Sequence, residues 1–143
     1  MDNFYLRSPA KGFNVINSKR ILLGKIGLDG HDRGALIVAE FLRTSGYEII
    51  YTGLHKTASE LIKIAVQEDT SIVGISILSG SHVVLIEQVF LEARKQGVSD
   101  LVLFLGGVIP DSDHKALIDL GVARIFSASD ELAAITNWLE SIA

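Results

Sequence analysis

The sequence predicts an α/β fold in which five parallel strands form one sheet with helices on both faces. From residue 20 onward, short apolar runs rich in β-branched residues alternate with amphipathic segments of helical length. The third run, residues 71–78, is apolar on both faces, as is typical of a buried parallel strand. Because the alternation repeats five times, we expect a doubly wound, flavodoxin-like (Rossmann-like) sheet with the strand order 2-1-3-4-5.

Each element follows from its own local pattern. We expect strands at residues 20–26, 47–51, 71–78, 101–105 and 124–126, and helices at residues 34–45, 57–68, 81–96, 111–120 and 130–142. Gly46 is expected to end the first helix, and Thr57 forms a capping box with Glu60 at the start of the second. The apolar residues of the first and third helices recur at helical spacing and are expected to face the core: Leu36, Ala39, Phe41 and Leu42 in the first, and Val84, Leu85, Val89 and Ala93 in the third.

Composition limits the function classes. The chain has 143 residues, 48% hydrophobic and 21% charged, so we expect one folded domain at residues 20–143 after an arm without regular periodicity at residues 1–19. The absence of cysteine excludes a disulfide framework, a thiolate metal site and a cysteine nucleophile. The net charge of -4 argues against nucleic acid as a partner. Without a long apolar run or a secretory signal, the sequence predicts a cytoplasmic protein with no membrane contact.

The loop after the first strand, residues 27–34, has the sequence GLDGHDRG and is rich in reactive groups. Ligands of doubly wound sheets bind beyond the carboxyl ends of the strands, where this loop lies. Asp29 precedes His31 by two residues, so its carboxylate can accept a hydrogen bond from one ring nitrogen while the other nitrogen faces a metal. Lys25 projects to the same side of the extended chain as Asp29 and is placed to pair with it. A lone histidine is also compatible with a surface or capping role.

Small residues follow the third and fourth strands. Ser76 is near the end of the third strand, and the pair Gly106-Gly107 follows the fourth. Two adjacent glycines leave a slot without side chains that suits a flat, wide ligand, although tight strand-to-helix turns use glycines as well. Together with Gly34, these positions predict a groove lined by small residues, with His31 at its rim.

Three short motifs occur in a fixed order along the chain, namely Asp29-x-His31-x-x-Gly34, Ser76-x-Leu78 and Gly106-Gly107. In this order, at these separations and on the expected strand ends, they resemble the cobalamin-binding domain of the adenosylcobalamin-dependent mutases. The resemblance covers about residue 20 to the C-terminus. Residues 25–34 and 106–110 are most similar to the methylmalonyl-CoA mutase branch.

The resemblance implies a role for each matching residue. It implies that His31 replaces the cofactor's own dimethylbenzimidazole as the lower axial ligand of cobalt, that Asp29 hydrogen-bonds this histidine, and that Lys25 supports Asp29. The displaced nucleotide tail is then expected in a pocket beside the sheet. The expected cofactor-binding residues are Asp29, Gly30, His31, Asp32, Arg33, Gly34, Ser76, Leu78, Gly80, Gly106 and Gly107. Beyond the relay of Lys25, Asp29 and His31, no catalytic residue is expected on this chain.

The resemblance also implies a partner. In the acyl-CoA mutases of this family, a 5'-deoxyadenosyl radical from adenosylcobalamin removes a substrate hydrogen, and the substrate binds in a separate TIM barrel. A chain of 143 residues has no space for a barrel. We therefore expect the cobalamin-binding small subunit of a hetero-oligomeric mutase, an isomerase that is inactive alone, with the arm docked on the large subunit. Methylmalonyl-CoA, isobutyryl-CoA and 2-hydroxyisobutyryl-CoA all stay open as substrates.

Two alternatives match less well. A corrinoid carrier protein of a methyltransferase system usually has a helical domain before its cobalamin domain, and residues 1–19 are too short to form one. A receiver of the response-regulator type needs a lysine after the fifth strand, where this chain has Phe126-Ser127-Ala128. The remaining histidines, His55, His82 and His114, are not expected to bind the metal.

Overall fold

The structure, a computed structural model, confirms the expected α/β fold. It describes residues 20–25, 33–53, 56–77, 82–127 and 129–142. Within these ranges the strands are β1 (Arg20–Lys25), β2 (Glu48–Tyr51), β3 (Ile72–Ile77), β4 (Val102–Gly107) and β5 (Arg124–Ser127). The helices are α1 (Arg33–Thr44), α2 (Ala58–Gln67), α3 (His82–Lys95), α4 (Asp111–Leu120) and α5 (Leu132–Ile142). All paired strands are parallel, and the sheet order is β2-β1-β3-β4-β5, as expected.

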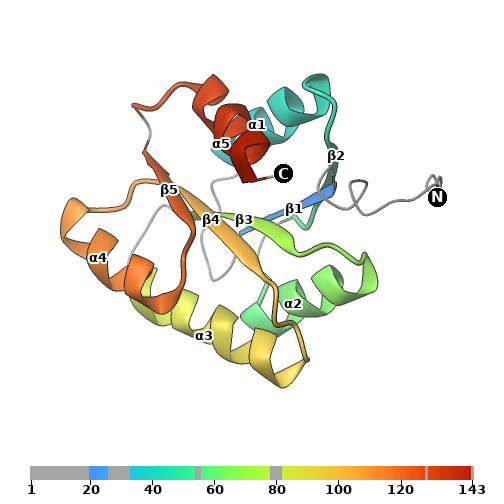
Figure 1. The fold of residues 1–143 in the computed structure, drawn as a ribbon, viewed down its shortest axis with the longest axis vertical. Coiled ribbons are helices and arrows are strands. Elements are labelled where there is room, and N and C mark those ends of the chain that lie inside the picture. The colour runs from blue at the N-terminus through green and yellow to red at the C-terminus, as the bar shows by residue number, and fades with distance from the viewer. Residues whose placement is uncertain (1–19, 26–32, 54–55, 78–81, 128, 143) are drawn as a thin grey trace.

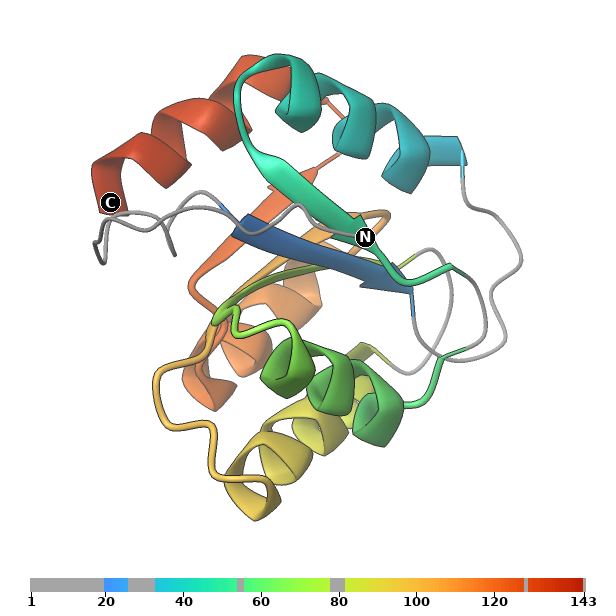
Figure 2. The same cartoon turned by 90° about the vertical axis from the view of Figure 1, so that its right-hand side faces the viewer.

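Helices cover both faces of the sheet, with α1 and α5 on one face and α2, α3 and α4 on the other (Figures 1 and 2). Each face has its own core. Leu22 and Val73 pack with α2, α3 and α4, whereas Ile21 and Phe104 pack with α1 and α5. Because successive residues of a strand point to opposite faces, a sheet covered on both sides needs apolar residues at consecutive positions. The uninterrupted apolar runs of the sequence have this physical origin.

The strand register aligns four residues near the carboxyl ends of the strands. Lys25 of β1 lies beside Ser76 of β3, Ser76 beside Gly106 of β4, and Gly106 beside Phe126 of β5. Registered residues of parallel strands point to the same side of a sheet. Phe126 belongs to the core under α1 and α5, so these four positions form a row on that face.

Two helix boundaries follow from the local signals that predicted them. The hydroxyl of Thr57 accepts a hydrogen bond from the backbone N–H of Glu60, and the Glu60 carboxylate accepts one from the backbone N–H of Thr57, which confirms the capping box. Gly46 follows the end of α1 with a φ of +102°, a conformation that glycine adopts without steric cost.

Two kinds of expectation are wrong. Gly106 and Gly107 belong to β4, not to a loop, because they pair with Ser76 and Ile77 of the neighbouring strand. The side chains of Leu36 and Val84 are 44% and 56% exposed, so they do not face the core. Ala39 and Leu42 of α1 and Val89 and Ala93 of α3 are buried as expected, and Ala35 and Ile86 are buried with them.

The arm at residues 1–19 lies outside the described residues, so the domain boundary at residue 20 stays a prediction. Within the described ranges, no helix combines the length and the apolar character needed to span a membrane.

Candidate functional site

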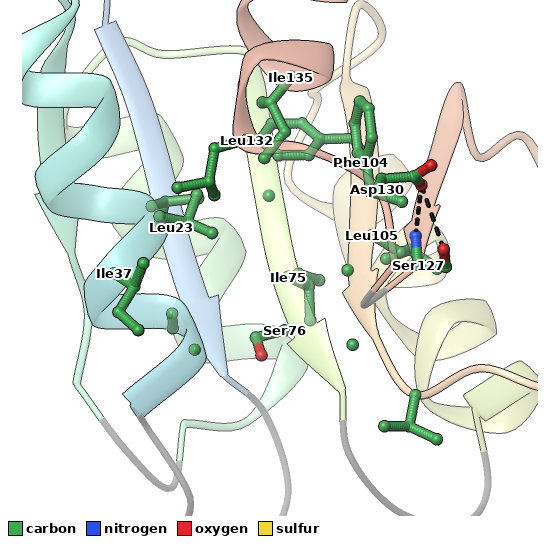
Figure 3. A pocket seen from close by; sticks show the side chains of 18 of the residues that line it. Leu23, Ile37, Ile75, Ser76, Phe104, Leu105, Ser127, Asp130, Leu132 and Ile135 are labelled. Carbon is green, nitrogen blue, oxygen red and sulfur yellow. Dashed lines mark hydrogen bonds between the residues drawn. The ribbon is translucent and has the colours of Figure 1, made fainter.

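A cavity of about 350 Å³ lies between the sheet and the two helices α1 and α5. Strands β1, β3, β4 and β5 form its floor, and the first half of α1 and the start of α5 form its walls (Figure 3). The volume is within the range of small-molecule sites in proteins. The cavity reaches the carboxyl ends of the strands, where doubly wound sheets bind their ligands. It is therefore the candidate site for the function.

Two glycines keep this cavity open. A Cβ added to Gly34 would meet no atom within 4 Å, and one added to Gly106 would meet only the Phe126 carbonyl oxygen, at 4.0 Å. Both glycines line the cavity, and neither has a positive φ that would exclude a side chain. Neither packing nor backbone conformation therefore explains the missing side chains. Both positions leave open space beside the backbone that a ligand can occupy.

Gly107 also lines the cavity, but its role is in the backbone. Its φ is +123°, and an added Cβ would overlap the carbonyl oxygen of Ile77. That oxygen accepts a hydrogen bond from the backbone N–H of Val108, with a nitrogen–oxygen distance of 3.1 Å. Gly107 thus lets the chain leave β4 while it stays hydrogen-bonded to β3.

Polar groups lie on one side of the cavity, where β5 turns into α5 (Figure 3). The Asp130 carboxylate accepts hydrogen bonds from the Ser127 backbone N–H at 2.7 Å and from the Ser127 hydroxyl at 3.3 Å. The backbone N–H of Asp130 in turn donates to the Ser127 carbonyl oxygen at 3.1 Å. This closed turn fixes the carboxylate beside the cavity. A second hydroxyl, that of Ser76, faces the cavity from β3 (Figure 3).

Lys25 ends β1 and is only 1% exposed, although lysine is rarely buried. A buried ammonium group is retained where other groups compensate the loss of water. Lys25 lies beside Ser76, at the carboxyl end of β1, and residues 26–32 follow it in the chain. The pairing of Lys25 with Asp29 stays a prediction, because Asp29 lies outside the described residues.

The structure brings five of the predicted residues to one end of the sheet: Lys25, Gly34, Ser76, Gly106 and Gly107. All of them except Lys25 line the cavity. Arg33 is the first residue of α1. The other predicted residues, Asp29, Gly30, His31, Asp32, Leu78 and Gly80, lie outside the described residues, so the cobalt ligand and its hydrogen bond stay predictions. Among the described residues, no group of three or more metal-ligating side chains comes together.

Sequence reasoning selected no residue from the part of the cavity that β5 and α5 build. Ser127, Asp130, Leu132 and Ile135 all line it. The available signal was the polar run Ser127-x-Ser129-Asp130 directly after the fifth strand, at the edge of the sheet where ligands bind.

The fold and the cavity agree with what comparison of the sequence shows. A model of the B12-binding domain family matches residues 19–135, and the chain belongs to that family. The solved structure of a cobalamin-binding protein from Desulfitobacterium hafniense has the same fold. Its TM-score is 0.75 at 19% sequence identity, over 89% of this chain and 60% of that one.

Within the family, the chain is a relative of acyl-CoA mutase small subunits. It is 41% identical over 123 residues to the 2-hydroxyisobutanoyl-CoA mutase small subunit of Aquincola tertiaricarbonis. The matched region covers 86% of this chain and 90% of that protein. It is 44% identical over 108 residues to the pivalyl-CoA mutase small subunit of Xanthobacter autotrophicus. Here the matched region covers 75% of this chain and 72% of that protein. Both relatives are subunits of isomerases.

Proposed function

We propose that this chain is the cobalamin-binding small subunit of an adenosylcobalamin-dependent acyl-CoA mutase. The observation that carries the proposal is the open cavity under α1 and α5 in a member of the B12-binding domain family. Gly34 on the helix side and Gly106 on the sheet side leave space that the chain itself does not use. The residues present therefore fit a bulky group inserted from the carboxyl edge of the sheet.

In this proposal the cavity holds the nucleotide tail of the cofactor. Most of the residues that line it are apolar, which suits an aromatic base. Ser76 offers a hydroxyl that can donate to or accept from the polar part of the tail. Gly34 and Gly106 let the tail approach the backbone of α1 and β4 closely.

His31 is proposed as the residue that would bind the cobalt of the cofactor. Asp29 accepts a hydrogen bond from the other ring nitrogen, which fixes the tautomer and makes the imidazole a stronger ligand. Lys25, buried at the end of β1, offsets part of the Asp29 charge and so limits how far the imidazole N–H is polarised. The bound cofactor supplies the 5'-deoxyadenosyl radical. The residues of this chain hold and orient the cofactor.

A second subunit is proposed to bind the acyl-CoA in a TIM barrel. The relatives named as small subunits support a large partner subunit, because a small subunit is one part of a larger enzyme. We propose a branched or hydroxylated acyl-CoA as the substrate class. To test this, the chain and the large subunit from its own organism are assayed alone and together on the candidate esters. Turnover that needs both chains supports the proposal, and turnover by the large subunit alone contradicts it.

The cobalt ligand can be tested by electron paramagnetic resonance of cob(II)alamin bound to nitrogen-15-labelled protein. If a protein nitrogen binds cobalt, each cobalt hyperfine line is split into a doublet, since nitrogen-15 has spin one half. If the cofactor's own base binds, they are triplets from nitrogen-14. We expect doublets from the wild type and from His114→Ala, whose altered histidine is on α4. We expect the doublets to be lost in His31→Ala, and triplets in the wild type would contradict the proposal.

A further inference from the structure

Helix α3 carries large apolar side chains on its outer face. It lies between α2 and α4, on the side of the sheet opposite the cavity (Figures 1 and 2). Val84 is 56% exposed and Leu91 is 41% exposed. Because these residues are two helical turns apart, they lie on one line along the helix, and the exposed Gln88 lies between them. These three residues form the α3 stripe.

Two opposite charges lie along one side of the α3 stripe. Glu87 and Arg94 are exposed, and each is about one turn from Leu91. Other exposed cations pair with a carboxylate of their own helix, as Arg43 does with Glu40 at 3.7 Å. Within the part of the chain that the structure describes, neither Glu87 nor Arg94 has such an ion pair. Their charges are therefore available to a second surface.

We infer that the outer face of α3 is an interface between two copies of this chain. If two antiparallel α3 helices are related by a two-fold axis near Leu91, the leucines of both copies meet at the centre. The same axis places Glu87 of each copy opposite Arg94 of the other, because both residues lie on the same side of the stripe. The face is thus complementary to itself in apolar character and in charge, which favours a second copy as its occupant.

This interface leaves the candidate site accessible. The cavity lies under α1 and α5 on the other face of the sheet and reaches the carboxyl ends of the strands. A second copy on α3 does not cover it, so the inference does not depend on the proposed function. Because the α3 stripe is narrow, we expect a reversible dimer that forms as the protein concentration rises.

The test measures the mass of the purified full chain by sedimentation equilibrium over a range of concentrations. We expect the mass to rise from that of one chain toward that of two. In Arg94→Glu, like charges face each other across the interface, and association should weaken by about tenfold or more. Arg43→Glu is the matched control, because it makes the same charge change on α1, on the other face of the sheet. We expect this control to associate like the wild type, and equal association of Arg94→Glu and the wild type would overturn the inference.

Mixing two charge variants tests the pairing itself. Glu87→Arg has two cations beside the stripe and Arg94→Glu has two carboxylates, so unlike protomers attract each other and like protomers repel. We expect each variant alone to stay monomeric where the wild type pairs, and an equimolar mixture to pair. A mixture that stays monomeric would overturn the inference. A wild type that is monomeric at every concentration would do so as well, and if Arg94→Glu then weakened binding to the large subunit, the face would belong to that partner.

Discussion

The indole ring of Trp138 packs edge-on against the ring of Phe104, with the two centroids 5.4 Å apart and the planes inclined by 63°. Phe126 completes a triangle of rings, with its centroid 5.9 Å from Trp138 and 6.1 Å from Phe104. These contacts join α5 to β4 and β5, and both phenylalanines line the cavity. The position of α5 over the sheet, and with it the shape of the cavity, depends on this aromatic triangle.

Replacing Trp138 should therefore weaken the fold. We expect Trp138→Leu to lower the free energy of unfolding by about 2–3 kcal/mol, because it removes both edge contacts and part of the buried area. Urea unfolding followed by circular dichroism measures the loss. Trp138→Phe keeps an aromatic ring at this position and should lose less. If the leucine variant is as stable as the wild type, the aromatic triangle does not hold α5 in place.

A side chain at Gly107 should be more damaging than its small size suggests. Alanine there would have to adopt a φ near +123° and would overlap the Ile77 carbonyl oxygen. We expect Gly107→Ala to cost more than about 2 kcal/mol of folding stability. Trp138 is the one tryptophan of the sequence, so its fluorescence can follow unfolding. The neighbouring variant Gly106→Ala is the matched control and should unfold near the wild-type midpoint.

Gly106 offers the opposite case, in which binding is lost and the fold is kept. Valine suits a strand, and a Cβ at Gly106 would meet only the Phe126 carbonyl oxygen, at 4.0 Å, so the free energy of unfolding should change by less than about 1 kcal/mol. The same side chain enters the cavity, so we expect the affinity for adenosylcobalamin to fall by about tenfold or more. Titration by absorption spectroscopy measures the affinity. A Gly106→Val protein that binds as tightly as the wild type would show that the tail lies elsewhere.

The sequence predicts those features of the molecule that depend on patterns of neighbouring residues. The two periodicities locate all five strands and helices, and strand-end motifs locate Ser76 and Gly106 at the cavity. The errors arise where tertiary packing decides. Gly106 and Gly107 look like a turn but pair with β3, because a strand can include glycines when its neighbour fixes them.

Burial on the helices and around α5 depends on packing as well. Leu36 is apolar and near the expected stripe of α1, yet the helix turns Ala35 toward the sheet. A helical period fixes spacing and leaves the phase to the neighbouring elements. Asp130 and Leu132 were not predicted as cavity residues because they lie just before and at the start of the last helix, where the helical period does not tell which side chains turn toward the sheet.

The capping box of α2 should make stability depend on pH in a defined direction. The pKa of Glu60 is lowered below its ordinary value of 4.5, mainly because its carboxylate accepts a hydrogen bond from the backbone N–H of Thr57. Because its pKa is lower in the folded state, ionised Glu60 stabilises the fold at pH values above its unfolded-state pKa. This contribution is lost as the pH falls through the folded-state pKa. Glu60→Gln should therefore be less stable than the wild type at neutral pH, and the difference should close in acid.

The other member of the capping box provides a comparison that does not titrate. Thr57→Ala removes the acceptor for the Glu60 backbone N–H and should cost about 1 kcal/mol at neutral pH. Urea unfolding at several pH values measures both variants. A difference between Glu60→Gln and the wild type that persists unchanged in acid would show that the Glu60 charge is not involved.

The cavity belongs to only one of the two cores, the one beneath α1 and α5. A ligand held there adds to stability by mass action, about 2.7 kcal/mol at a concentration one hundred times its Kd. This gain falls on one layer of the molecule, so the amides of α1 and α5 should slow in hydrogen exchange more than those of α2 and α3 when the cofactor is added. The supply of the vitamin would then set how long the subunit survives in a cell, as well as how much of it can work.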